Sequence, residues 1–159
     1  MWHEISIPAC PSTIRGYSHA DLGLCFVVTS DGLFVLCLDP SPNWQRIGDG
    51  IEEHMLFDDE LLTFNDSALF YRDVRFALHG FPFLDDVDYS DIPLDTHPSG
   101  QRLTYDPQTD SALILHNESE FQRIDIGITE EWTTAGFSSD GRHLTFASLA
   151  WVRVFEFTP

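Results

Sequence analysis

The sequence predicts an all-β protein built from four repeats of about 40 residues, each a four-stranded antiparallel sheet. Short apolar runs alternate with polar turns along the whole chain, and no window shows the sustained 3.6-residue apolar period of a helix. Similar meanders begin near Leu24, Leu61 or Leu62, Leu103 and Leu144, 37 to 41 residues apart. The segment Trp44-Gln-Arg-Ile also recurs as Phe121-Gln-Arg-Ile at the same place in its repeat.

The first repeat contains the clearest hairpin. Residues 24–29 are predicted to be a buried strand and residues 33–38 the returning strand. Between them, Ser30-Asp31-Gly32 is typical of a tight turn, because glycine adopts positive φ at little cost. Residues 14–18 are expected to form the inner strand of this repeat and residues 44–47 the outer one.

The later repeats follow the same plan. In the second, strands are predicted near residues 54–57, 61–64, 68–72 and 75–78. The third is expected to have an inner strand near Thr96, a turn at Pro98-Ser99-Gly100 and a meander over residues 103–126. The fourth starts near Thr133 and ends with a strand over residues 151–157.

The last repeat has only three predicted strands, and residues 2–7 at the other end form a short alternating strand with no partner nearby. Because pairing the two ends removes two exposed sheet edges, we expect this strand to complete the last repeat. The sequence thus predicts one domain over residues 1–159, with repeats at about 14–47, 54–79, 95–127 and 133–157 plus the strand 2–7.

The net charge is strongly negative. The chain has 26 acidic residues and eight basic ones, a formal charge of −18, and every basic residue is an arginine. This charge repels nucleic acid and anionic membranes, and it attracts basic proteins. We therefore expect a basic protein partner, no nucleic acid and no membrane; the alternative is that the charge serves solubility alone.

The remaining composition indicates a reducing compartment and no catalytic centre. Of three cysteines, Cys25 and Cys37 lie inside apolar strands, which favours a cytoplasmic protein. The histidines lack HxH and HExxH spacing, and the chain has no GxSxG motif and no phosphate-binding glycine loop. Asp86, Asp88 and Ser90 have calcium-loop spacing, but the loop's glycine and final glutamate are missing. We expect no catalytic residues, no metal and no cofactor.

The C-terminal segment AGFSSDGRHLTFASLAWVRVFEF resembles a blade of a WD-repeat or related β-propeller protein, in which a Ser-Asp-Gly turn precedes an apolar strand and a Val-Arg-Val-aromatic strand follows. HPSGQRLTYDP is similar to the same turn and strand. The sequence departs from the family at Phe155-Glu156, where Trp-Asp is usual, and no Gly-His pair opens a blade. The resemblance implies a propeller-like array that works by binding. A closed four-blade ring, an open arc, or two chains completing a larger ring all remain open, and so does the choice between monomer and homodimer.

A long connection over residues 81–95 carries five aspartates mixed with aromatic residues, and long loops in compact domains are often functional. The alternative is that its aromatic residues fill the core. We expect the acidic loop face to bind the partner through these residues: Asp85, Asp86, Asp88, Asp91, Tyr89, Phe83, Glu52, Glu53, Glu130 and Glu131.

The function favoured by the sequence is therefore that of a non-catalytic protein-binding module. By analogy, a compact acidic chain without catalytic motifs fits an inhibitor or immunity protein that neutralises a toxin or nuclease whose own site is basic. The alternative is an Asp-rich domain that binds a metal or small ligand, with or without enzymatic activity.

Overall fold

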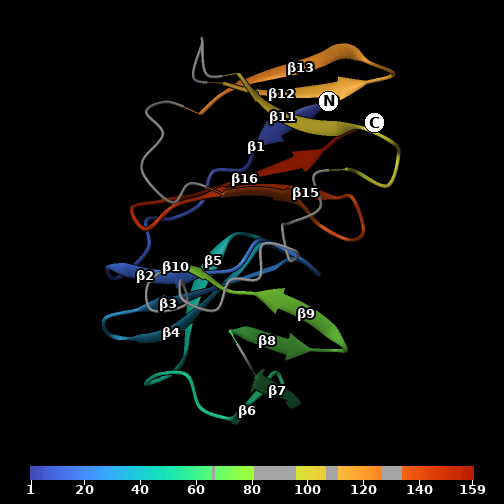
Figure 1. The fold of residues 1–159 in the computed structure, drawn as a ribbon. Coiled ribbons are helices and arrows are strands. Elements are labelled where there is room, and N and C mark those ends of the chain that lie inside the picture. Colours follow the sequence, from blue (N-terminus) through green and yellow to red (C-terminus); the bar gives the residue numbers. More distant parts are fainter. Residues whose placement is uncertain (66, 81–95, 107–110, 127–133) are drawn as a thin grey trace.

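The computed structural model describes residues 1–65, 67–80, 96–106, 111–126 and 134–159. These residues form 16 β-strands in four antiparallel sheets and contain no helix. The all-β prediction is therefore confirmed. We number the sheets I to IV in chain order; Figure 1 shows them as four layers in the spatial order III, IV, I, II.

Sheet I contains nearly continuous apolar strands because it is covered on both faces. Its strands are β2 (Ile14–Tyr17), β3 (Leu24–Thr29), β4 (Gly32–Cys37) and β5 (Asn43–Gly48), with the short β10 (His79–Gly80) added beside β2. Gly32 begins β4 at φ 134°, as the Ser-Asp-Gly turn predicted. Alternate residues of β3 and β4 face sheets II and IV, so both sets of side chains are buried.

Sheet II has the four strands that its sequence predicted: β6 (His54–Phe57), β7 (Glu60–Asn65), β8 (Ala68–Tyr71) and β9 (Val74–Ala77). Its hairpins turn at Asp58-Asp59 and Arg72-Asp73, and all four of these residues have positive φ. That is the type I′ geometry, whose twist matches the twist of the flanking strands.

Sheets III and IV lie at the other end of the stack. Sheet III consists of β11 (Arg102–Asp106), β12 (Ser111–His116) and β13 (Ser119–Asp125). Sheet IV consists of β14 (Thr134–Phe137), β15 (His143–Ala147), β16 (Val152–Phe157) and, from the other end of the chain, β1 (Trp2–Glu4).

The chain ends pair as the sequence predicted. Trp2 lies opposite Phe157, and Glu4 opposite Phe155, in an antiparallel ladder. Ile5 extends it by donating its backbone N–H to the Val154 carbonyl at 2.8 Å. The strand is shorter than predicted, because after Ile5 the segment turns to pack Ile5 and Ile7 against the core between sheets I and IV.

Three apolar clusters hold the layers together. Residues such as Phe26, Leu62 and Phe76 pack between sheets I and II. Val27 and Val154 belong to the cluster between sheets I and IV. The third cluster lies between sheets III and IV and contains the N-terminal tryptophan: Trp2, Ala112, Ile114, Ile124, Ile126, Phe137, Leu144, Phe146 and Phe155.

One expectation about the repeats is corrected. Near Thr96 the described residues form only a single bridge, to Arg102, because the turn at residues 98–100 follows at once. Sheet III therefore has three described strands, not four. After the four strands of the second repeat, His79 and Gly80 pair with Tyr17 and Gly16 of sheet I, a contact that the sequence did not predict.

The apolar clusters join consecutive layers of the stack, and none of the three joins sheet II to sheet III. Sheets II and III are consecutive in the sequence and lie at opposite ends of the stack in Figure 1. Each of these two end sheets consequently has an outer face that the three clusters leave uncovered.

Candidate protein-binding surface

Five arginines have acidic partners on the described surface. Within the described residues, ion pairs join Arg46 to Asp49 (2.7 Å), Arg72 to Glu60 (2.9 Å), Arg123 to Glu120 (3.0 Å), Arg142 to Asp39 (3.4 Å) and Arg153 to Glu4 (2.8 Å). Exposed pairs of this kind stabilise the fold by at most about 1 kcal/mol each. For function, these ion pairs mean that the charges of the basic side chains are partly neutralised. A large surplus of carboxylates still faces solvent.

The β6–β7 hairpin of sheet II exposes large apolar side chains. Leu56 and Leu61 lie directly opposite each other across the ladder. Their exposed fractions are 72% and 54%, respectively. The neighbours Met55 and Phe57 point the other way and pack against the core between sheets I and II. Because successive side chains of a strand alternate between faces, fixing Met55 and Phe57 inward directs Leu56 to solvent.

Acidic residues border this apolar pair at both ends of β6. Glu52 and Glu53 precede the strand, and Asp58, Asp59 and Glu60 form the turn and the start of β7; all five are exposed. Arg72 is the guanidinium that faces them, 3.6 Å from Asp58 and 2.9 Å from Glu60. Five carboxylates and one guanidinium leave a local surplus of four negative charges around two exposed leucines.

We refer to Leu56, Leu61 and these five acidic residues as the hairpin patch. An exposed apolar anchor inside a charged border is the usual organisation of a protein-binding surface. The anchor supplies apolar area that a partner can bury, and the border attracts a partner of opposite charge. The hairpin patch therefore has the composition needed to bind a basic protein surface.

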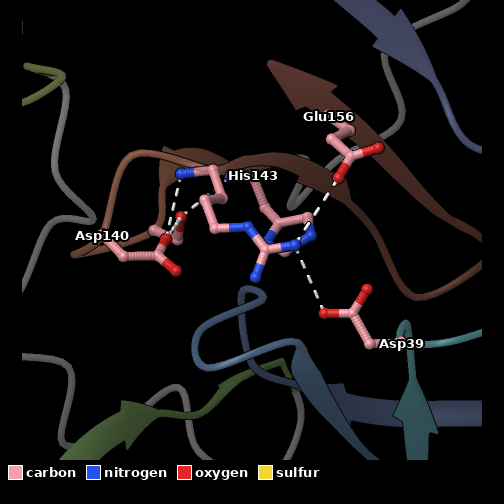
Figure 2. Close-up of polar contacts among 6 residues, drawn as sticks. Asp39, Asp140, His143 and Glu156 are labelled. Atoms are coloured by element: carbon pink, nitrogen blue, oxygen red, sulfur yellow. Dashed lines mark hydrogen bonds and ion pairs between the residues drawn. The ribbon is translucent and has the colours of Figure 1, made fainter. Parts of the chain in front are cut away.

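A second acidic cluster joins sheets I and IV. Arg142 Nη2 lies 3.4 Å from Asp39 Oδ2 and 3.6 Å from Glu156 Oε1. These contacts are the dashed lines that reach the Asp39 and Glu156 carboxylates in Figure 2. Asp140 is held in the preceding turn, where its Oδ1 accepts hydrogen bonds from the Ser138 hydroxyl (2.6 Å) and the Arg142 N–H (2.9 Å). Because its groups bind one another across the interface, this cluster ties two sheets together.

His143 lies beneath that cluster and is 1% exposed. Burial lowers the pKa of its imidazole, and Arg142 adds to this effect, whereas the carboxylates of Asp140, Asp39 and Glu156 oppose it. Its Nδ1 is buried and has no hydrogen-bond partner. Burial raises the pKa of the Asp140 carboxyl, but the two hydrogen bonds and the nearby charges of His143 and Arg142 together outweigh burial, so that pKa is lowered. The result is a neutral imidazole beside an ionised carboxylate.

A further polar group lies between sheets I and IV. His19 stacks on His79 with ring centroids 4.9 Å apart, and its Nε2 is 2.7 Å from the Thr134 hydroxyl. That hydroxyl also donates to the Tyr17 hydroxyl at 3.1 Å. Burial raises the pKa of Tyr17 to about 12 and lowers the pKa of His19 well below its ordinary value, with His79 adding to the latter effect.

We expect this histidine to make the fold less stable in mild acid. Since the folded pKa of His19 is depressed, the unfolded chain binds a proton below about pH 6.5 that the folded chain does not bind. The free energy of unfolding should fall between pH 7 and 5, with His19 contributing up to about 1.4 kcal/mol per pH unit. Urea unfolding at several pH values should show a shallower slope for His19→Gln. An identical slope in the two proteins would contradict this prediction.

Of the residues predicted to bind a partner, the structure describes two. Glu52 and Glu53 are exposed and belong to the hairpin patch. The others lie outside the described residues, and their roles stay predictions: Asp85, Asp86, Asp88, Asp91, Tyr89, Phe83, Glu130 and Glu131. Sequence reasoning missed Leu56 and Leu61. The available signal was alternation of apolar residues within HMLF, but which of its two sets faces the core depends on where sheet I lies.

Comparison with protein-family models, with characterised proteins and with solved structures finds no match to this chain. The function must therefore be argued from the surface itself. Among the described residues, no three His, Cys, Asp or Glu side chains are grouped so that they could hold a metal ion. The same part of the chain contains no helix long and apolar enough to cross a membrane.

Proposed function

We propose that this protein is a non-catalytic binding module for a basic protein and that the hairpin patch is part of its docking surface. The observation that carries the proposal is the exposed Leu56–Leu61 pair bordered by five carboxylates. A leucine that is fully buried by a partner contributes about 1.5–3 kcal/mol. The carboxylates at the border act mainly on the rate of association and on its salt dependence.

The proposal includes the arrangement of the sheets. The four sheets would be the blades of a propeller-like arc that is open between sheets II and III, in keeping with the resemblance of the C-terminal segment to a WD-repeat blade. An open arc presents the outer face of an end blade to solvent. The exposed leucines of sheet II can then contact a partner, whereas in a closed ring the next blade would cover that face.

The partner class that fits best is a protein whose own working surface is basic, such as a toxin or nuclease that this chain would neutralise. An acidic surface that covers a cationic active site blocks its anionic substrate by occupying the same charges. The predicted acidic connection over residues 81–95 would contribute to the same binding event. The alternative of an Asp-rich metal or small-ligand site gains no support from the described residues.

Paired charge variants test this function. Affinity capture with the parent chain in cytoplasmic extract, followed by purification of the captured basic protein, provides a partner for kinetic measurements. In Glu52→Gln/Glu53→Gln we expect slower association and a weaker salt dependence, because two border charges are lost. Leu56→Ala should instead speed dissociation by roughly tenfold or more.

The matched control is Glu118→Gln/Glu120→Gln, which also removes two negative charges, but from the β12–β13 hairpin at the opposite end of the stack. If both double variants changed association equally, the net charge and not the hairpin patch would determine binding. If Leu56→Ala dissociated like the parent protein, the apolar anchor would lie elsewhere.

A further inference from the structure

The backbone of β6 has hydrogen-bonding groups that point away from its sheet. β6 is the outermost strand of sheet II, with β7 on its other side. The Phe64 N–H donates to the Glu53 carbonyl at 2.9 Å, so Glu53 and Phe64 form a hydrogen-bonded pair. Such pairs alternate with non-hydrogen-bonded pairs along an antiparallel ladder. The residues of β6 in non-hydrogen-bonded pairs are therefore His54, opposite Thr63, and Leu56, opposite Leu61.

In a non-hydrogen-bonded pair, the N–H and C=O of each residue face away from the partner strand. His54 and Leu56 thus direct two donors and two acceptors outward, and no backbone hydrogen bond between described residues engages these groups. The strand HMLF also lacks the charged side chains that commonly protect a sheet edge. The edge is therefore chemically ready to accept another strand.

The charges at the two ends of β6 indicate which strand would fit. Glu52 and Glu53 lie before it, and Asp58 and Asp59 after it. A strand of this length spans about 13 Å at roughly 3.3 Å per residue. Glu53 and Asp58 lie just beyond the strand and are five residues apart, so a segment lying alongside would bring residues five or six positions apart to the two acidic ends. Residues between those positions would lie beside Leu56 on the outer face.

We propose that β6 binds its partner by strand addition, and that the bound segment is an extended peptide with basic residues at both ends and apolar residues between them. This inference rests on the proposed function and specifies how the hairpin patch is used. Main-chain hydrogen bonds to His54 and Leu56 would hold the segment. Leu56 and Leu61 would cover its apolar side chains, and the carboxylates would pair with its ends.

A second copy of the chain is the competing occupant, because two β6 edges could pair with each other. The charge argues against it. Two such edges would bring together two patches that each carry a surplus of four negative charges, on chains with a formal charge of −18. A basic segment removes that repulsion, whereas a second copy doubles it.

The test uses a synthetic peptide with two arginines at each end and Val-Thr-Val-Thr-Val in the middle, and the same peptide N-methylated on alternate amides. Binding to the full chain is measured by fluorescence titration and by NMR. We expect the parent peptide to bind, the Leu56 amide to exchange more slowly with solvent, and the N-methylated peptide to bind at least tenfold more weakly. Binding should also weaken as salt concentration rises.

A pair of variants at His54 separates backbone pairing from side-chain docking. His54→Pro removes the outward N–H without removing a hydrogen bond to β7, and prolines are tolerated at such edge positions. His54→Ala keeps the N–H and loses only the imidazole. We expect His54→Pro to lose at least tenfold in affinity for the parent peptide and His54→Ala to bind like the parent chain.

Three results would overturn strand addition. Equal binding of the two peptides, or equal binding by the two His54 variants, would show docking through side chains alone and would leave the proposed function standing. Slow exchange of the Leu56 amide without peptide, in a chain that sediments as a dimer, would identify a second copy as the occupant. No salt-dependent binding of either peptide, with unshifted resonances of the hairpin patch, would count against the proposed function as well.

Discussion

Replacing Trp2 by alanine is expected to remove about 3–5 kcal/mol from the free energy of unfolding, the range measured for large aromatic residues in cores. Trp2 is 2% exposed, and its ring packs against Phe137 and Phe157 at centroid distances of 5.4 and 5.0 Å. Since small domains are stable by only about 5–15 kcal/mol, this one substitution would remove a large share of the total. Urea unfolding followed by circular dichroism measures the change.

The same tryptophan links sheets III and IV through polar contacts. Its indole N–H donates to the Gln101 side-chain oxygen at 2.9 Å, and its backbone N–H donates to Gln122 at 2.8 Å. Trp2→Phe keeps an aromatic ring but leaves the Gln101 oxygen without its donor, so we expect an intermediate loss of about 1–3 kcal/mol. If Trp2→Ala had the same free energy of unfolding as Trp2→Phe, the aromatic ring of β1 would not stabilise the interface between sheets III and IV.

Gly32→Ala is expected to cost roughly 2–5 kcal/mol, because backbone strain and a steric clash add together. Gly32 has φ 134°, and a Cβ at this position would lie 2.3 Å from the Gly48 carbonyl oxygen. Neither atom can move without separating β4 from β5. Thermal and urea unfolding should both show the loss.

The matched control for Gly32 is Gly50→Ala, two residues beyond β5. A Cβ there meets no atom within 4 Å, and the residue does not have positive φ. We expect its stability to stay within about 0.5 kcal/mol of the parent. If the two alanine variants unfolded at the same urea concentration, the close approach of β4 and β5 at Gly32 would not constrain the fold.

The parts of the fold that could be predicted are those with strong local signals. The hairpin of β3 and β4 follows from two apolar runs around Ser30-Asp31-Gly32, and the pairing of β1 with β16 follows from a missing strand at one end and an unpaired strand at the other. β10 could not be predicted, because two residues are too few to carry a periodic pattern. Its pairing depends on where sheet I lies in space.

The candidate site shows the same limit. Glu52 and Glu53 were predicted from their charge and from their place in a loop between two predicted repeats, and neither feature depends on how the sheets pack. Leu56 and Phe57 are equally apolar in the sequence, and only the packing of sheet II on sheet I decides that Phe57 is partly buried and Leu56 is 72% exposed. Alternation divides the side chains of a strand between two faces, but it does not say which face is exposed to solvent. That depends on which elements pack against the strand in space.

The pairing of β1 with β16 has a consequence for the order in which the protein matures on the ribosome. Residues 2–4 are synthesised about 150 residues before their partners, residues 155–157. Trp2 therefore stays unpaired until β16 has emerged, and a nascent chain that stops before β16 leaves both Trp2 and the edge of β15 open to other strands. Sheet IV can therefore be completed only after β16 has been translated.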